Sequence, residues 1–258
     1  MAENHFNKYR KELDAINLKT IDDLENLVKP LIKDATKIIL KRQEKMPENT
    51  QLKSQFGGQP YFEKGEHWPM AKNGEKLEFV FQIFNEEGLI IPEKIKLIQF
   101  YYDFDSDELI WDTEDDGWLV KIYENIDKDN CVIIEKPEEL DTVKYFDIEY
   151  EKVKSLPDWE GISTFCDNAS KLSCVLNEDA PWVNYDNTVE KLIGEQNMYS
   201  QLGGYAQWIQ GGRAHKDFVF LFQIDSEEDA GLYWSDVGMI YVFYNCKTKE
   251  IKFELQSC

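Results

Sequence analysis

Acidic side chains recur at regular spacing in the segment DFDSDELIWDTE, residues 103–114. The acids at relative positions 1, 3, 5 and 12 are Asp103, Asp105, Asp107 and Glu114. This spacing imitates the calcium loop of an EF-hand, in which hard oxygen ligands converge on one ion. However, Glu108 stands where that loop has a glycine, and the flanking segments are typical of strands and not of helices. A calcium-binding loop and a solvated acidic hairpin loop are both open.

A second set of polar side chains lies in the C-terminal half of the chain. Gln223 interrupts the apolar run FVFLFQI, Asp225 follows it in FQID, and Asp236 precedes GMIYVF. Two carboxylates near an aromatic side chain such as Trp208 could form an acid/base pair that acts on a small substrate. The first half has phenylalanine where Asp225 stands, so no symmetric active site is expected.

Two glutamines interrupt apolar runs at similar places, Gln82 in FVFQIF and Gln223 in FVFLFQI. A buried amide must have hydrogen-bond partners. Each glutamine is therefore expected either to bond to the backbone or to make a polar contact in a binding groove. With two tryptophans and the two aspartates, they complete our candidate binding residues: Gln82, Trp68, Trp208, Gln223, Asp225 and Asp236.

Motifs for nucleophilic or zinc chemistry are absent from the sequence. The three histidines, His5, His67 and His215, have no cysteine or serine partner in a recognised arrangement. The five cysteines are scattered, odd in number and without a Cys-x-x-Cys, which argues against a zinc site or a disulfide framework. We assign no catalytic residue and no cofactor.

The net charge of the chain indicates which classes of partner it can bind. The chain has 50 acidic and 29 basic residues and a net charge of −21, which argues against direct binding to nucleic acid. A basic protein partner suits this charge better. The sequence begins without a secretory signal and has no apolar run of membrane-spanning length. We expect a cytoplasmic protein without a membrane partner.

Residues 20–45 have apolar side chains at helical spacing and predict the strongest helix of the sequence. Thr20 and Asp23 resemble a capping box, and acids collect at the start while bases collect at the end. Pro30 predicts a break near Lys29, because proline removes a backbone donor and clashes with the preceding turn. A second, short helix is expected near residues 187–197.

From residue 77 onward, short aromatic and β-branched runs alternate with turn residues. The runs are LEFVFQIF, IKLIQFYYDF, WLVKIYENI, CVIIEK, FVFLFQI, GMIYVFYN and IKFELQ. These compositions predict strands, and the scarcity of long helices between them favours antiparallel pairing. The expected fold class is α+β, predominantly antiparallel β.

Two similar series of segments indicate an internal duplication. SQFGG at 54–58 matches SQLGG at 200–204, VFQI matches LFQI, and KLIQFYYDFD matches GMIYVFYN in the same order. Each glycine pair predicts a tight turn or bulge beside a strand, since the phosphate-loop and dinucleotide patterns are absent. The expected organisation is a helical segment over 1–48, a first β-rich repeat over 49–155 and a second over 156–258.

The ordered motifs give the chain a resemblance to a known family. SQFGGQPYF with the following HWP, VFQIF, KLIQFYYDFD, SQLGGYAQWIQ, LFQIDS and WSDVGMIYVF resemble the YwqG-like bacterial family, a domain of unknown function, over residues 54–243. Ala206 and Val237 depart from residues frequent in that family. The resemblance implies a cytosolic, internally duplicated β fold packed as one domain. It also implies a distant similarity to the programmed cell death protein 2 group.

These observations favour one function and leave two alternatives. The resemblance and the acidic charge together favour a non-catalytic protein-binding module, chaperone-like or immunity-like, for a basic client. The first alternative is an enzyme for a small substrate with a carboxylate site in the second repeat. The second alternative is a calcium-binding module built on residues 103–114.

Overall fold

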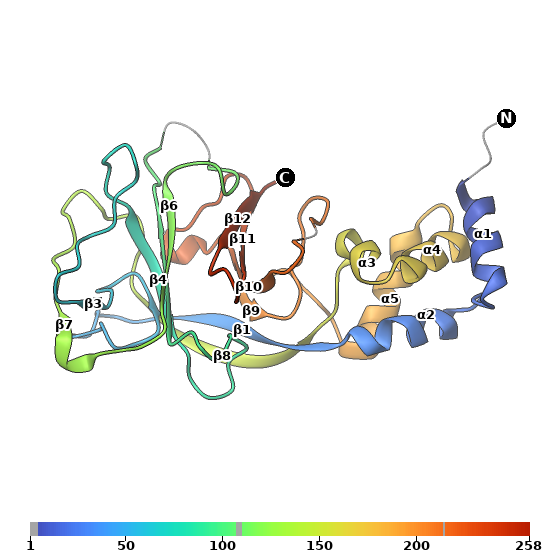
Figure 1. Ribbon diagram of the computed structural model, residues 1–258, viewed down its shortest axis with the longest axis horizontal. Coiled ribbons are helices and arrows are strands. Elements are labelled where there is room, and N and C mark those ends of the chain that lie inside the picture. The colour runs from blue at the N-terminus through green and yellow to red at the C-terminus, as the bar shows by residue number, and fades with distance from the viewer. Residues whose placement is uncertain (1–4, 107–109, 214) are drawn as a thin grey trace.

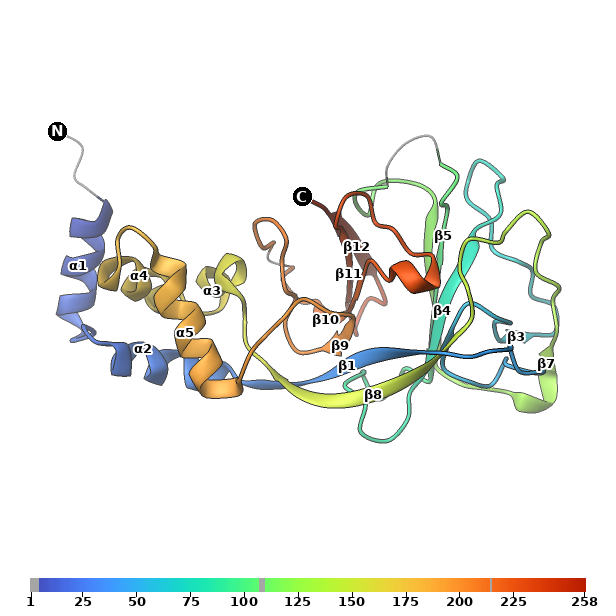
Figure 2. The same ribbon diagram turned by 180° about the vertical axis from the view of Figure 1, so that it is seen from behind.

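The computed structural model of the protein describes residues 5–106, 110–213 and 215–258. Helices gather at one end of the elongated molecule and strands fill the other (Figure 1). The long strands β1 (Lys33–Arg42) and β8 (Phe146–Ser155) run from the helical end into the sheet (Figure 2). We refer to the two parts as the helical unit and the β unit.

The helical unit combines segments from two distant parts of the sequence. Its helices are α1 (His5–Ala15), α2 (Ile21–Val28), α3 (Trp159–Phe165), α4 (Asp167–Leu176) and α5 (Pro181–Ile193). They share one apolar core, in which Leu24, Leu172 and Tyr185 are fully buried. Among the described residues no helix has the length and apolar character that crossing a membrane requires.

The predicted start and break of the helix after Thr20 are both present. The Thr20 hydroxyl accepts a hydrogen bond from the Asp23 N–H at 3.2 Å, and the Asp23 carboxylate accepts one from the Thr20 N–H at 2.9 Å. Helix α2 ends at Val28 and continues as a single 3₁₀ turn over Lys29–Leu31, which contains Pro30. The proline therefore ends the α-helix where predicted.

The prediction that the helix continues beyond Lys29 is wrong. Residues Lys33–Arg42 form strand β1, which pairs with β8 on one side and with the short strand β9 (Gln201–Gly203) on the other. Thr36, Ile38 and Ile39 are β-branched and suit a strand. Backbone pairing along both edges overrides the helical spacing of the apolar side chains, because helix propensity is a weak preference.

Ten strands form one antiparallel sheet. Besides β1, β8 and β9, it contains β2 (Gln55–Phe56), β4 (Glu78–Phe84), β5 (Leu97–Tyr102), β6 (Trp118–Tyr123), β10 (Val219–Asp225), β11 (Met239–Tyr244) and β12 (Ile251–Gln256). Its order is β12-β11-β10-β9-β1-β8-β2-β4-β5-β6. A separate pair, β3 (Phe62–Glu63) with β7 (Cys131–Val132), forms a small second sheet. The expected predominance of antiparallel strands is confirmed.

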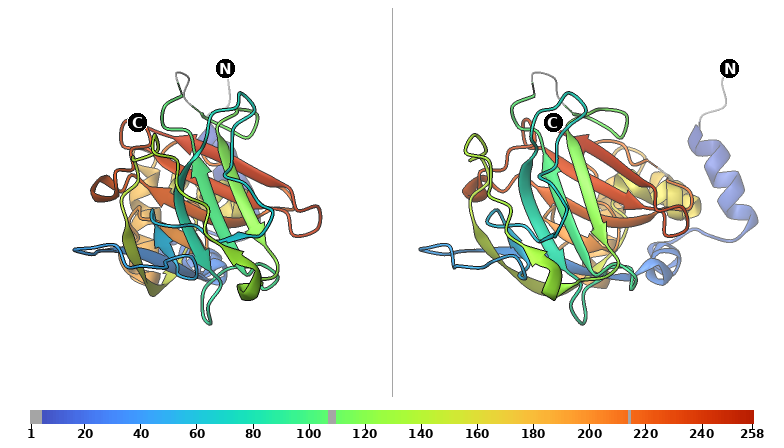
Figure 3. Two further views of the ribbon diagram at one scale, coloured as in Figure 1. Left: turned by 90° about the vertical axis from the view of Figure 1, so that its left-hand side faces the viewer. Right: turned by 60° about the vertical axis from the view of Figure 1, so that its left-hand side comes forward.

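The large sheet curls until its two ends approach each other, so that it is nearly closed like a barrel (Figure 3). The chain between β5 and β6 makes a bridge from Asp112 to Glu254 in β12, and the Leu255 N–H donates to the Trp111 carbonyl at 2.7 Å. The aromatic interior includes Phe100, whose ring centre lies 6.2 Å from that of Phe222 on the opposite flank. Burial of large rings from both flanks stabilises the curled sheet.

The two flanks of the sheet correspond in order and register. Outward from β8 lie β2, β4, β5 and β6, and outward from β1 lie β9, β10, β11 and β12. Gln55 pairs with Gln82, and Gln201 pairs with Gln223. Each of the two flanks also has a β-bulge at the matching place, beside Val80 and beside Leu221 respectively.

The motifs SQFGG and SQLGG adopt the same local structure. The Ser54 hydroxyl accepts from the backbone N–H of Phe84 at 3.0 Å, and the Ser200 hydroxyl accepts from that of Asp225 at 3.1 Å. All four glycines have a φ between 56° and 75°, in the left-handed region that a side chain disfavours. Each motif is therefore a short strand followed by a glycine turn.

Several elements were not predicted. Strand β8 and helices α1, α3 and α4 lie in segments that received no assignment, and α5 spans Pro181–Ile193 where only 187–197 was expected. β8 reads FDIEYEKVKS, in which charged residues alternate with apolar ones. Half of the residues of β8 are charged, because one face of the strand is exposed. The alternation of charged and apolar residues is nevertheless typical of a strand.

Candidate functional site

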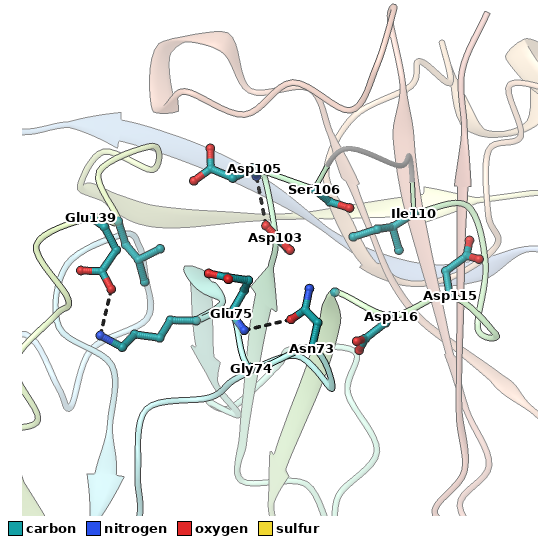
Figure 4. A pocket seen from close by; sticks show the side chains of 13 residues that line it. Asn73, Gly74, Glu75, Asp103, Asp105, Ser106, Ile110, Asp115, Asp116 and Glu139 are labelled. Carbon is teal, nitrogen blue, oxygen red and sulfur yellow. Dashed lines mark hydrogen bonds and ion pairs between the residues drawn. The ribbon is translucent and has the colours of Figure 1, made fainter.

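Loops at one end of the β unit enclose a cleft of about 840 Å³, which we term the acidic cleft (Figure 4). It is formed by the chain around residues 73–76, by the connection between β5 and β6, and by residues 139–140. Six carboxylates line it: Glu75, Asp103, Asp105, Asp115, Asp116 and Glu139. Asp103 and Asp105 belong to the acidic segment 103–114 identified in the sequence, and Asp115 and Asp116 directly follow that segment.

Backbone hydrogen bonds hold some of these carboxylates in place. The Asp103 carboxylate accepts from the Asp105 N–H at 3.0 Å, and the Asp116 carboxylate accepts from the Lys72 N–H at 2.8 Å. The second contact joins the loop before β4 to the loop before β6. This hydrogen bond joins two walls of the acidic cleft that are 44 residues apart in the sequence.

The acidic cleft has little positive charge of its own. Its described lining residues contain one ammonium group, that of Lys76, which binds the Glu139 carboxylate at 2.8 Å. Among the described residues, Glu75 and Asp105 have no ion-pair partner. Burial raises the pKa of Asp103, and the nearby charges of Asp105 and Glu75 raise it further. The site is therefore suited to receive positive charge.

The described part of the chain has no arrangement of ligands that supports the calcium hypothesis. Asp103 and Asp105 line the acidic cleft, Glu114 does not, and Asp107 lies outside the described residues. No group of three or more Asp, Glu, His or Cys side chains among the described residues is placed to hold a metal ion. The flanking elements are the strands β5 and β6, as predicted, whereas an EF-hand has helices there.

The candidate residues of the second half do not meet in one cavity. The Gln223 amide accepts from the Gln207 N–H at 2.9 Å and donates to the Tyr199 carbonyl at 2.9 Å, so it is bonded to the backbone. Asp225 is half-buried, and burial raises its pKa, whereas Asp236 is exposed. Of Gln223, Asp225, Asp236 and Trp208, only the tryptophan lines either of the two large clefts.

The candidates of the first half are also bonded to the backbone. The Gln82 amide accepts from the Tyr61 N–H at 2.8 Å and donates to the Lys53 carbonyl at 2.8 Å. The indole N–H of Trp68 donates to the Leu77 carbonyl at 2.8 Å. These side chains hold loops against the sheet, and sequence reasoning could not distinguish that role from ligand binding.

A second cleft, of about 730 Å³, lies where the helical unit meets the second flank of the sheet. We term it the aromatic cleft. Its lining includes six aromatic side chains: Phe165, Tyr205, Trp208, Phe218, Phe220 and Phe243. Four basic side chains share the lining: Lys33, Arg213, His215 and Lys216. Apart from Trp208, sequence reasoning missed this site, because the residues come from five separate stretches of chain.

Asp158 connects the helical unit to the aromatic cleft. Its carboxylate caps helix α3 by accepting from the Gly161 N–H at 2.7 Å and also accepts from the backbone N–H of Trp208. Burial raises the pKa of Asp158 to about 7. The two backbone donors oppose this shift without cancelling it.

The raised pKa of Asp158 predicts a pH-dependent contribution to stability. In the unfolded chain this carboxyl ionises near its ordinary value of 3.8. As pH rises from about 4 to about 7, the unfolded state releases a proton that the folded state retains, so stability falls. Relative to Asp158→Asn, the protein should therefore lose stability over this window.

Urea unfolding of both proteins at about pH 4, 5, 6, 7 and 8 measures the difference. Asparagine has the same shape but does not titrate, which makes it the matched reference. Parallel stability profiles for the two proteins would contradict the raised pKa.

Comparison with known proteins identifies the family of the chain. A search of curated proteins found no match. Residues 54–252, more than half of the chain, match the family described as domain of unknown function DUF1963. This agrees with the expected domain of unknown function, and YwqG-like membership in particular stays a prediction. The matched range contains both glycine motifs and most of the sheet, and the chain thus belongs to the DUF1963 family.

Proposed function

We propose that the protein is a non-catalytic binding protein whose acidic cleft receives a positively charged segment of a protein partner. One observation carries the proposal. In the part of the chain that the structure describes, six carboxylates line a single cleft, and the one ammonium group there is already paired with one of them. Lysine and arginine side chains of a basic partner supply the missing positive charge.

The charge of the whole chain supports the same partner. A net charge of −21 produces a negative field that attracts basic proteins and repels nucleic acid. Such complementarity raises the rate of encounter and suppresses partners of the wrong charge. This charge and the family resemblance support a chaperone-like or immunity-like role for a basic client.

The enzyme alternative has less support from the geometry. Gln223 and Gln82 are both bonded to the backbone, and Asp225 and Asp236 line neither cleft. A pair of carboxylates acting as acid and base must reach the same substrate. The calcium alternative likewise has no group of three ligands among the described residues.

We infer further that the two flanks of the β unit are copies of one unit. The paired glutamines, the bulges and the serine contacts recur at matching places on either side of β1 and β8. The copies have diverged outside these contacts. The acidic cleft lies on the first flank, and the aromatic cleft lies mainly on the second, with Ile90 and Pro92 of the first flank at its edge.

The proposed function predicts charge-specific binding at the acidic cleft. A fluorescein-labelled deca-lysine peptide serves as the probe, with affinity measured by fluorescence anisotropy. The double variant Glu75→Gln/Asp105→Asn removes two exposed carboxylates that have no ion-pair partner among the described residues. We expect it to bind the peptide about five to ten times more weakly, from roughly 0.5–0.7 kcal/mol for each charge.

A matched control removes the same number of charges elsewhere. Glu44 and Glu48 are exposed and follow strand β1, so Glu44→Gln/Glu48→Gln reduces the negative charge equally without touching the acidic cleft. This control should retain most of the affinity. Equal losses in the two double variants would show that the peptide responds only to net charge and would overturn the assignment of the cleft.

A further inference from the structure

We propose that the aromatic cleft binds a small organic anion that carries a flat ring system. The proposal rests on the aromatic side chains that line the cleft and on an opening that the first flank of the sheet lacks. It also rests on the basic side chains gathered there in an otherwise acidic protein. It is independent of the proposed function, because the acidic cleft lies on the other flank and favours the opposite charge.

Aromatic rings line the cleft in two groups. Trp208 stacks on Phe243 with 5.8 Å between ring centres and 16° between planes, and Phe220 lies 5.4 Å from Phe243. Phe165 meets Tyr205 edge-on at 4.8 Å. Flat rings offer large contact areas and favourable stacking for another flat ring. The aromatic lining thus favours a planar ligand over a flexible chain.

The corresponding surface of the first flank is covered by the protein itself. The Tyr61 N–H donates to Gln82, and the Gln207 N–H donates to Gln223, the equivalent glutamine of the second flank. The residues that follow, Phe62 and Trp208, therefore correspond to each other. Phe62 is in β3, which pairs with β7, and it is fully buried. In the described part of the second flank no strand corresponds to β7. Trp208 therefore lines an open cleft.

Basic side chains are concentrated at this opening. The Lys33 ammonium lies 4.0 Å from the centre of the Tyr205 ring and has no carboxylate partner among the described residues. Partial burial lowers the pKa of Lys33. Asp34, the one carboxylate among the described lining residues, is paired with Lys154 at 2.6 Å. An anion entering the cleft would supply the negatively charged partner that the Lys33 ammonium group lacks.

A buried carboxylate holds two of the other basic groups. Glu254 in β12 is buried, and its carboxylate lies 2.5 Å from the Nε2 atom of His215 and 3.6 Å from the Nε atom of Arg213. The His215 ring also packs on Phe243 with 4.4 Å between centres. The contacts with Glu254 and Phe243 position His215 before a ligand arrives, which reduces the entropy lost on binding, whereas the Arg213 side chain is 63% exposed.

The Trp208 side chain provides a polar group at the ring wall. Its exposed fraction is 6%, and its indole Nε1 is not one of the buried polar atoms that lack a hydrogen-bond partner. An indole N–H is a donor only, so an acceptor atom of a ligand in the cleft can accept from it. The cleft therefore combines stacking surfaces, an N–H donor and positive charge, the features that recognise a ring-bearing anion.

Three naphthalene compounds of matched shape test the charge preference: 2-naphthoate, the neutral 2-naphthamide and the cationic 2-naphthylmethylamine. Affinities are measured by isothermal titration calorimetry on the full chain at low ionic strength. We expect 2-naphthoate to bind about tenfold more tightly than the amide, and the cation to bind most weakly. The advantage of the anion should shrink as salt is added, since screening weakens exposed charge interactions. Equal affinities, or tighter binding of the cation, would overturn the proposal.

Two lysine variants locate the site. Lys33→Met keeps the apolar stem but removes the ammonium group, and it should weaken 2-naphthoate binding about tenfold while leaving the amide nearly unaffected. Lys37→Met is the matched control, because Lys37 is in the same strand, lies 4.9 Å from the centre of the Tyr199 ring and does not line the cleft. An equal loss in both variants would contradict the assignment.

A third variant tests the cleft without removing a contact. Thr164 is an exposed residue of α3 that lines the aromatic cleft, so Thr164→Trp adds volume at the opening without disturbing the core. It should reduce the affinity for both 2-naphthoate and 2-naphthamide at an unchanged melting temperature. Undiminished binding of both compounds would place them elsewhere on the protein and overturn the proposal.

Discussion

Replacing Gln82 by leucine is expected to lower the free energy of unfolding by about 4 kcal/mol, at roughly 1 kcal/mol for each lost hydrogen bond. The buried amide accepts from Tyr61 and Gln99 and donates to the carbonyls of Gln51 and Lys53, at distances between 2.8 and 3.1 Å. Leucine is similar in size but satisfies none of these four groups. Their desolvation is then uncompensated, which is the reason for the large effect.

The corresponding glutamine of the second flank provides a graded comparison. Gln223 makes two such bonds, to Gln207 and Tyr199, so Gln223→Leu should cost about 2 kcal/mol on the same reasoning. Urea denaturation measures both free energies, provided that the slope of the transition is unchanged. Equal losses for the two variants would contradict the view that the number of hydrogen bonds made by the amide determines the cost.

Replacing Gly57 by alanine is expected to cost about 3 kcal/mol, the sum of backbone strain and steric overlap. Gly57 has a φ of 56°, and an added Cβ atom would lie 2.7 Å from the Lys144 carbonyl oxygen and 2.8 Å from its carbon. Because these neighbours are backbone atoms, the chain at Gly57 or at Lys144 must move to accommodate the methyl group. The prediction concerns folding, since Gly57 lines neither cleft.

Gly65 provides the control for the steric part of this effect. Its φ is 95°, and an added Cβ atom would have no neighbour within 4 Å. Gly65→Ala should therefore lose only the conformational part, about 1 kcal/mol. Thermal and urea unfolding of the two variants can be compared directly. A loss at Gly57 no larger than at Gly65 would show that the close approach to Lys144 is unimportant.

The repeated motif has the same structural role in both flanks of the sheet. The sequence predicted a tight turn or bulge beside a strand for the glycine pairs of SQFGG and SQLGG. In the structure, the serine hydroxyl of each motif bonds the neighbouring strand, and the glutamine amide bonds the turn that follows, from Gln55 to Gln59 and from Gln201 to Tyr205. The motif fixes one short strand and one turn in each flank.

The sequence predicted elements whose signals are local. The capping box at Thr20 and the break caused by Pro30 depend on neighbouring residues alone, and both occur. Strands of β-branched and aromatic residues bounded by turns were also found, as in β4, β5, β10 and β11. Their antiparallel pairing followed from the short connections, because parallel strands require long crossovers.

The sequence failed where two structures compete for the same residues. Residues 33–42 have apolar side chains that suit a helix or a strand, and pairing with β8 and β9 selects the strand. Both partners are more than 100 residues away, so no local pattern reports them. The acidic cleft was recognised in part, because the carboxylates between Asp103 and Asp116 are close together in sequence.

By itself, then, the sequence determined the acidic charge, the two similar series of motifs, the local turns and the antiparallel β class, since each depends on composition or on neighbouring residues. Only the tertiary structure decided where the chemistry is located. The pairing of β1 with β9 brings the start of β1 near Gly204 and Tyr205, so Lys33 lies over the Tyr205 ring. An aromatic cleft with basic groups arises there because the curled sheet and helix α3 bring distant side chains together.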